Sequence, residues 1–176
     1  MKRIATLWCV ALVSSALLIG TANGRMSASV NAAVSQDPQT FTHAQAGVQF
    51  QLPKGWKAKP DGEVITVGPA DDSIQVVFWV PDEETFDAAV KELDNELGKT
   101  IKNIKTTGKP TSDTHNGMAH FGENGTGVVE GATIEWSVDV LGAKKPLIIL
   151  TFAAPNLFEK HADNYMKLVQ SIKKVE

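Results

Sequence analysis

The residues with the types and spacing for metal chemistry lie between positions 113 and 123. His115 and His120 are five residues apart, and Asp113 and Glu123 flank them, so together they could ligate a metal ion at the surface. None of the 4 histidines pairs with another at the i, i+4 spacing by which one helix presents two ligands. Because polar loops often hold such residues without a ligand, we expect no metal and no cofactor.

A glycine-rich stretch at residues 122 to 127, Gly-Glu-Asn-Gly-Thr-Gly, has the composition of a phosphate-binding loop. Such a loop needs a helix directly behind it, because the helix N-terminus supplies the N–H donors and the dipole. No helical pattern follows this stretch. The sequence therefore predicts a hairpin loop here.

The candidate binding residues are Trp79, Glu135 and Asp139. The two carboxylates lie on one face of an alternating segment, roughly 13 Å apart at ~3.3 Å per residue, which exceeds the separation of a glycosidase pair. Trp79 shares its parity with Gln75 and Val77. If that face is open, it lies on the same side of the sheet as the carboxylates, where a large amphipathic ring is suited to recognition. No residue is predicted to be catalytic.

The first 24 residues have the pattern of a secretory signal. Lys2 and Arg3 precede an uncharged run over residues 4 to 20, and small residues follow it. We expect cleavage after Gly24, with cleavage after Ala32 and a retained membrane anchor as the alternatives. The protein is then periplasmic or secreted.

Cleavage of the signal would change both the reactive groups and the net charge of the mature chain. Cys9, the one cysteine, lies inside the signal, so the mature chain has no thiol for a disulfide, a metal or a nucleophile. Removing Lys2 and Arg3 from the 17 basic residues leaves 15 against 20 acidic ones, a formal charge of −5. No basic stripe is present, so we expect no nucleic-acid partner. No later segment is apolar and long enough to span a membrane.

The mature chain reads as a flexible lead over residues 25 to 40 and one domain over residues 41 to 176. The lead has no apolar period. In the domain, apolar residues recur with strand or helix spacing between turn signals. The predicted strands are residues 48–52, 63–67, 73–80, 104–108, 118–121, 134–140 and 146–154.

The clearest strand pattern is at residues 134 to 140, where Ile134, Trp136, Val138 and Val140 should face the core and the alternate residues should face outward. Residues 146 to 154 are apolar on both parities, which predicts a central strand. The order β-β-β-α-β-β-β-β-α indicates an α+β fold, with a mainly antiparallel sheet of about six to seven strands and two packed amphipathic helices.

The two helices are predicted from apolar stripes and end signals. The first should begin with Asp82 as its cap and stop near Gly98. The second should begin at a capping box made by Asn156 and Glu159 and run to the C-terminus. Their buried stripes are predicted as Phe86, Ala89, Val90, Leu93 and Leu97 in the first helix and Phe158, Ala162, Tyr165, Val169 and Ile172 in the second.

The segment Phe50-Gln51-Leu52-Pro53-Lys54-Gly55-Trp56, together with the element order and the closing helix, resembles the PsbP-like superfamily over residues 41 to 175. This superfamily includes the photosystem II extrinsic subunit, periplasmic DcrB-type proteins and Ran-binding nuclear-import factors. The resemblance implies a binding or scaffolding module with no shared catalytic site. The export signal places the chain nearer the DcrB-type branch, and no functional residue carries over.

The sequence thus predicts an exported, non-catalytic binding or scaffolding module, monomeric or weakly dimeric, for an unidentified protein or small ligand. One alternative is an enzyme, such as a hydrolase, whose site is assembled from loops. The other is a structural component of an envelope assembly. A deep pocket with convergent titratable groups would favour the enzyme, and a flat exposed patch would favour the binding module.

Overall fold

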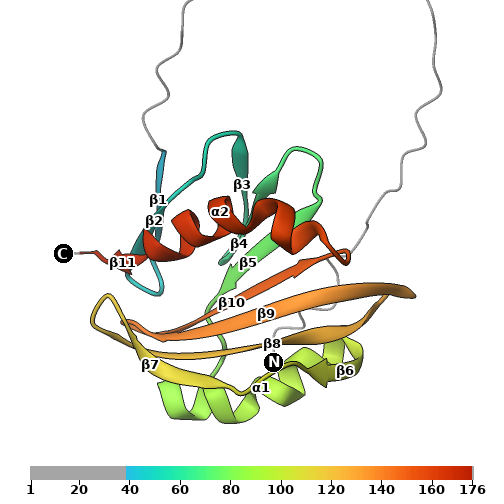
Figure 1. Ribbon diagram of the computed structural model, residues 1–176. Helices are drawn as coiled ribbons and strands as arrows, with labels where there is room; N and C mark the ends of the chain where they lie inside the picture. Colours follow the sequence, from blue (N-terminus) through green and yellow to red (C-terminus); the bar gives the residue numbers. More distant parts are fainter. Residues whose placement is uncertain (1–38, 176) are drawn as a thin grey trace, which may run out of the picture. The chain divides into compact units, whose positions relative to one another are not determined.

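The computed structural model describes residues 39 to 175, and the predicted signal and nearly all of the predicted lead lie outside these residues. Two sheets and two helices form the fold (Figure 1). No helix in residues 39 to 175 is long and apolar enough to cross a membrane. The elements are β1 Thr40–His43, β2 Val48–Gln51, β3 Trp56–Asp61, β4 Val64–Pro69, β5 Ile74–Trp79, α1 Phe86–Thr100, β6 Lys102–Thr106, β7 Thr111–His115, β8 Met118–Val129, β9 Ala132–Gly142, β10 Pro146–Ala153, α2 Leu157–Gln170 and β11 Lys173–Lys174.

The larger sheet is antiparallel in every pair and has the order β3-β4-β5-β10-β9-β8-β6, with β7 also paired to β8. The smaller sheet has the order β1-β2-β11. These sheets and the two helices confirm the predicted α+β class. The predicted central strand is also confirmed, because every residue of β10 is buried.

The two helices lie on opposite faces of the larger sheet, α2 above it and α1 below it in Figure 1. On the α2 face, Leu168 and Ile172 belong to one core cluster with Phe50 of β2 and Phe78 of β5. The stacked rings of Phe50 and Phe78, 4.5 Å apart between centroids, join the small sheet to the large one. On the other face, α1 packs over β9, β8 and β6.

The predicted core positions of β9 are confirmed, since Ile134, Trp136, Val138 and Val140 are all buried. Four strands were missed by sequence reasoning: β1, β3, β7 and β11. β3 and β7 carry mostly polar, exposed side chains, and β11 has two residues, so none of them shows an apolar alternation.

The predicted start of the first helix was wrong. The N-cap is Thr85, whose hydroxyl accepts a hydrogen bond from the N–H of Ala88, and Asp82 lies in the loop before it. The helix continues past Gly98 to Thr100. Its buried stripe was predicted correctly, with Ala89, Leu93 and Leu97 fully buried and the other two members half-buried.

The predicted capping box of the second helix is also absent. Asn156 has the left-handed backbone conformation, with φ of 69°, and its side chain makes no capping hydrogen bond. The predicted stripe is confirmed except at Ala162, which is exposed: Ile172 is buried, and the other three members are half-buried. His161 and Leu168 are buried in addition. The helix ends at Gln170 and does not run to the C-terminus, because β11 follows it.

The predicted hairpin loop at residues 122 to 127 was wrong, because the stretch lies inside the long strand β8. Its glycines make room for neighbouring groups. A Cβ on Gly125 would lie 2.1 Å from the carbonyl oxygen of Lys105 and 2.7 Å from the Trp136 ring. A Cβ on Gly127 would lie 2.2 Å from the Ile101 side chain. β8 is glycine-rich because large groups pack directly onto its backbone.

We predict that Gly125→Ala destabilises the domain by about 1–3 kcal/mol, because the new methyl group overlaps a backbone oxygen and a buried indole. Gly98→Ala is the matched control. Gly98 lies in α1 with open space around the position of its Cβ, so that substitution should stabilise by roughly 0.4–1 kcal/mol. Chemical denaturation of both variants measures the effects, and a neutral Gly125→Ala would contradict the packing argument.

Candidate functional site

The three predicted binding residues do not form one site. Trp79 pairs with Ile148 of β10, which in turn pairs with Val140 of β9. Directly paired residues of an antiparallel sheet point to the same face. Trp79 therefore lies on the face of Val140, while Asp139, one residue earlier in β9, lies on the opposite face. The hypothesis that these residues share a side was wrong; whether any of them binds a partner stays a prediction.

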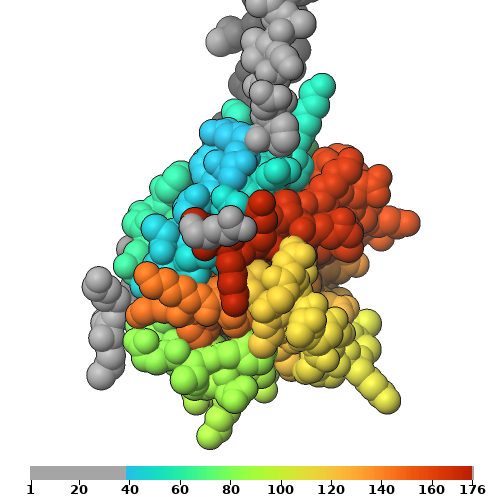
Figure 2. All heavy atoms as spheres, turned by 90° about the vertical axis from the view of Figure 1, so that its left-hand side faces the viewer, coloured from blue at the N-terminus to red at the C-terminus, as the bar shows by residue number. Residues whose placement is uncertain are grey.

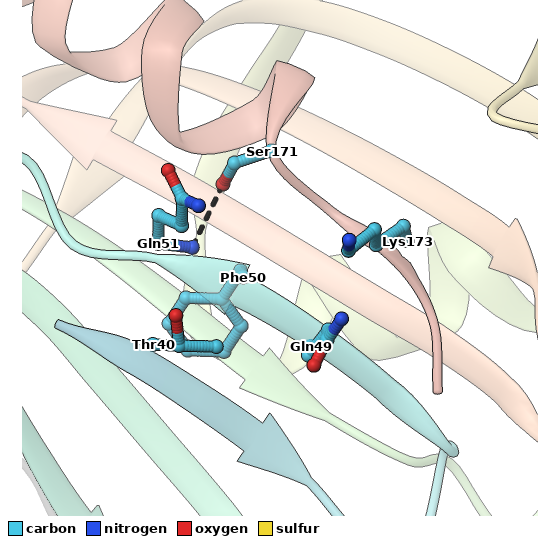
Figure 3. A pocket seen from close by; sticks show the side chains of 6 residues that line it. All are labelled: Thr40, Gln49, Phe50, Gln51, Ser171 and Lys173. Atoms are coloured by element: carbon cyan, nitrogen blue, oxygen red, sulfur yellow. Dashed lines mark hydrogen bonds between the residues drawn. The ribbon is translucent and has the colours of Figure 1, made fainter. Parts of the chain in front are cut away.

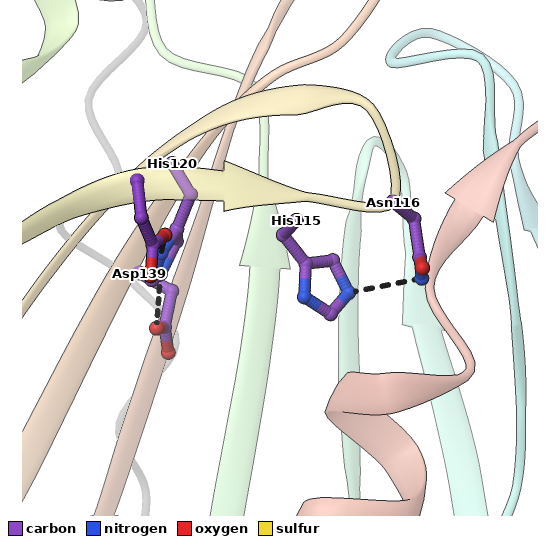
Figure 4. Close-up of polar contacts among 5 residues, drawn as sticks. His115, Asn116, His120 and Asp139 are labelled. Atoms are coloured by element: carbon purple, nitrogen blue, oxygen red, sulfur yellow. Dashed lines mark hydrogen bonds and ion pairs between the residues drawn. The ribbon is translucent and has the colours of Figure 1, made fainter.

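Asp139 belongs instead to a chain of hydrogen bonds on the α2 face of the sheet, which we call the polar seam and which consists of Asp113, His120, Asp139 and Tyr165. One ring nitrogen of His120, Nδ1, lies 2.6 Å from Asp113 Oδ1, and the other, Nε2, lies 2.9 Å from Asp139 Oδ1. The Tyr165 hydroxyl donates to Asp139 Oδ2 at 3.0 Å. The seam thus joins β7, β8, β9 and α2. Figure 4 shows its central part, the contact between His120 and Asp139.

Two neighbours shape the polar seam. Gly122 is paired with Asp139 across β8 and β9, and a Cβ on it would lie 3.2 Å from the His120 ring and 3.3 Å from Asp139 Oδ1. The glycine therefore leaves the space in which the ring and the carboxylate meet. Glu135, the other predicted carboxylate, is half-buried and takes no part in the seam.

The protonation of the polar seam follows from its geometry. Ionised carboxylates only accept hydrogen bonds, so His120 donates to both of them only in its doubly protonated form. The hydrogen bond to Asp139, aided by the one to Asp113, raises the pKa of His120 above 6.5 against the opposing effect of burial. Burial and the Asp139 charge raise the pKa of Tyr165, so it stays a neutral donor. The polar seam is an internally satisfied ion network.

The two histidines that the sequence brings near each other also lie close together in the fold, with the rings of His115 and His120 centred 6.3 Å apart. However, both nitrogens of His120 are engaged by carboxylates. Within residues 39 to 175, no group of three His, Cys, Asp or Glu side chains has the arrangement to hold a metal ion.

A second polar cluster, which sequence reasoning missed, joins Asp71, Ser73 and His161. Ser73 donates both its backbone N–H and its hydroxyl to Asp71 Oδ1, at 3.2 and 2.6 Å. His161 Nε2 lies 2.8 Å from the same hydroxyl oxygen and must donate to it, because the single hydroxyl proton is already used. A serine nucleophile needs a histidine that accepts its proton, so this order does not activate Ser73.

A shallow groove lies where β2, the β7–β8 turn and the C-terminal end of α2 meet. This corner groove has a volume of about 520 Å³ and is lined by Gln51, Asn116, Gln170, Ser171 and Lys173. A smaller hollow of about 90 Å³ adjoins it, shares three of these residues and adds Thr40, Gln49 and Phe50 (Figure 3). In Figure 2, the blue and cyan strands, the yellow hairpin and the dark red C-terminal segment lie side by side on this face.

The walls of the corner groove are fixed by hydrogen bonds between segments distant in sequence. Asn116, in the two-residue turn between β7 and β8, has φ of 46°, and its side-chain amide donates to the carbonyl oxygens of Gln170 and Ile172. The Ser171 hydroxyl accepts from the N–H of Gln51 at 2.9 Å and donates to the carbonyl of Leu168. The Asn-Gly turn was the one available sequence signal.

Three of the five side chains that line the corner groove are unengaged. Across the described part of the chain, the amides of Gln51 and Gln170 and the ammonium of Lys173 have no hydrogen-bond or ion-pair partner. All three side chains are exposed. The groove therefore combines a rigid frame with free polar groups, whereas the groups of the polar seam are already paired.

We predict that Trp136→Ala costs about 3–5 kcal/mol of stability, because Trp136 is 1% exposed and its indole N–H donates to the carbonyl of Thr126. Trp79→Ala should cost clearly less, because Trp79 is only half-buried. Chemical denaturation of both variants makes the comparison. Equal losses of stability in the two variants would show that Trp79 contributes as much to the core as Trp136 does.

We predict that His120 stabilises the domain more at pH 6 than at pH 8.5. The pKa of His120 is raised on folding, so its contribution is complete below about 6.5 and is lost as pH rises through the higher folded value. His120→Gln should therefore lower the free energy of unfolding by about 1.5–3 kcal/mol at pH 6, which is the contribution of a hydrogen bond to a charged group, and by less at pH 8.5.

The difference between wild type and His120→Gln at each pH is the quantity to measure. Taking this difference cancels the contribution of His43 to the pH dependence of stability, which has the opposite sign because burial lowers the pKa of His43. His43 is present in both proteins. Asp113→Asn is a milder companion variant, because the Asp113 side chain is 57% exposed and the Asp139 side chain 14%. A difference that does not depend on pH would show that His120 is neutral in the folded protein.

Comparison with known proteins finds similarity in structure only. No family model matches the chain, and no curated protein matches its sequence. The fold is similar to that of CyanoP, the PsbP of Synechocystis sp. PCC 6803, at 11% identity and a TM-score of 0.55, over 89% of this chain and 98% of that one.

Two further structures are similar at the same level. LpqN of Mycobacterium tuberculosis, a protein involved in cell envelope biogenesis, matches at 11% identity and a TM-score of 0.53, over 80% of this chain and 86% of LpqN. PA94 of Pseudomonas aeruginosa, of unknown function, matches at 13% identity and a TM-score of 0.52, over 76% and 94% of the two chains. With its two helices and antiparallel sheet, the domain has the PsbP-like fold.

Proposed function

We propose that this protein is exported and works outside the cytoplasm as a non-catalytic binding module, which captures a partner at the corner groove. The observation that carries the proposal is the groove itself: a frame held by four hydrogen bonds that presents three unengaged polar side chains. Because hydrogen bonds fix the frame before a partner binds, only these three side chains have to be ordered on binding.

The N-terminal pattern of charge, apolar run and small residues supports the exported location. Likeness of fold to CyanoP and to LpqN, the latter involved in cell envelope biogenesis, is compatible with this location. The role of LpqN also keeps a structural part in an envelope assembly as the second candidate function. In both, the protein acts by holding another molecule.

An enzyme of the hydrolase kind finds less support. The two clusters of titratable groups, the polar seam and the trio around Ser73, hold their protons in bonds to one another. Neither cluster lines the corner groove, whose one charged lining residue is Lys173. Besides the Lys173 ammonium the groove lining has no titratable side chain, and its one hydroxyl, that of Ser171, donates to the carbonyl of Leu168 and has no base beside it to activate it.

Site-specific photo-crosslinking in the source cells tests the proposal. Benzoylphenylalanine in place of Gln170 should give a discrete crosslinked adduct. The protein should be recovered from outside the cytoplasm, and the intact mass of its uncrosslinked fraction should match a chain that begins at Arg25. The same replacement at Lys91, an exposed residue of α1, is the control and should give no adduct. Equal adducts at the two positions, or none at Gln170, would contradict the groove as the binding surface.

A further inference from the structure

We propose that the ligand of the corner groove is an extended, acidic peptide segment of a partner protein. This inference rests on the proposed function and names the chemical class of the partner. Three features of the groove carry it: its charge, the kind of polar group that it offers, and the strand edge beside it.

The charge of the corner groove is opposite to that of the protein as a whole. Lys173 lines it, and no Asp or Glu does. Lys174 is also exposed, but it pairs with Val48 whereas Lys173 pairs with Gln49, so its side chain lies on the other face of the small sheet. Two carboxylates of the neighbouring strands, Asp113 of β7 and Asp139 of β9, are engaged by His120. On a chain with a formal charge of −5 after the signal, this is a positively charged recess that attracts a carboxylate or a phosphate.

The neutral groups distinguish between these two anions. The side-chain amides of Gln51 and Gln170, and of Gln49 in the adjoining hollow, each carry an N–H donor and a carbonyl acceptor. A peptide backbone presents the same pair of groups at every residue, so it satisfies both halves of each amide. An ionised phosphate only accepts hydrogen bonds and would leave the amide oxygens without partners. The lining therefore favours a peptide.

The strand edge favours an extended conformation of that peptide. β11 is the outer strand of the small sheet and pairs with β2 on one side. Val175 donates its N–H to the carbonyl of Gly47 on the β2 side. Since backbone groups alternate along a strand, the N–H and C=O of Lys174 point away from β2. An added strand can pair with them while an acidic side chain on the groove face of that strand reaches Lys173.

The test uses the mature protein and a fluorescein-labelled peptide that alternates Glu and Val, followed by fluorescence anisotropy. We expect saturable binding that weakens with added salt and is lost when Gln replaces every Glu. Lys173→Glu should weaken binding by about tenfold, because it replaces attraction by repulsion. Lys91→Glu makes the same charge change on α1 and should leave the affinity unchanged. Unchanged melting temperatures establish that both variants are folded.

Other results would overturn the inference in identifiable ways. Equal losses for the two lysine variants would show a general charge effect, and equal binding of the Gln peptide would remove the acidic requirement. Binding to vesicles of phosphatidylglycerol that requires Lys173, without binding of the Glu peptide, would identify an anionic lipid surface instead. If crosslinks form at Gln170 but the Glu peptide does not bind, this inference fails and the proposed function stands. If neither occurs, both fail.

Discussion

The structure depends on one strand that has no face toward water. Every residue of β10 is buried, with Leu147 and Ile149 on the side of α2 and Ile148 and Leu150 on the other. At about 25 cal/mol per Å² of apolar surface removed from water, such a strand is strongly stabilising only if both faces are covered. The chain meets this requirement by sending α1 to one face and α2 to the other. The strand order around β10 then determines which residues reach the sheet edges.

Close packing over the sheet is made possible by the composition of β8. Gly125 and Gly127 let Trp136 and Ile101 approach the strand backbone, and Gly122 gives His120 and Asp139 room to meet. Glycine weakens an isolated strand because it loses more conformational freedom on folding. In β8 the contacts made by the large groups packed against it offset that loss. One strand thus serves both the apolar core below the sheet and the polar seam above it.

Polar groups in this domain divide into those that the fold uses and those that it leaves free. Asp139, His120 and Tyr165 lie where burial makes an unpaired group expensive, and each is hydrogen-bonded to the next. At the corner groove, the side chains of Asn116 and Ser171 make the hydrogen bonds that hold the walls together. The glutamine and lysine side chains have no partner within the described residues and can bind another molecule. Pairing within the fold indicates a structural role, whereas freedom on a fixed frame indicates a binding role.

The sequence by itself determined the features that depend on local periodicity. The alternation around Trp136, the apolar run of β10 and the helical stripe ending at Leu97 predicted burial correctly, because side-chain direction repeats every 2 or 3.6 residues along the chain. Those patterns were sufficient for the α+β class. The resemblance to PsbP-like proteins rested instead on the segment from Phe50 to Trp56, together with the order of the elements and the closing helix. Where few apolar residues are present, as in the strand at 111 to 115, there is no hydrophobic periodicity from which a strand could be predicted.

Tertiary structure alone decided how these elements face one another. Parity within a strand does not say which face its neighbour shares, so only the register through β10 separates Trp79 from Asp139. From the sequence, the glycines of β8 indicate a loop. In the fold, the Trp136 ring packs against Gly125, which explains why a strand residue there is glycine. The walls of the corner groove are joined by hydrogen bonds from Gln51 to Ser171, 120 residues apart, and from Asn116 to Gln170, 54 residues apart. No local pattern records such contacts, because they exist only when the chain is folded.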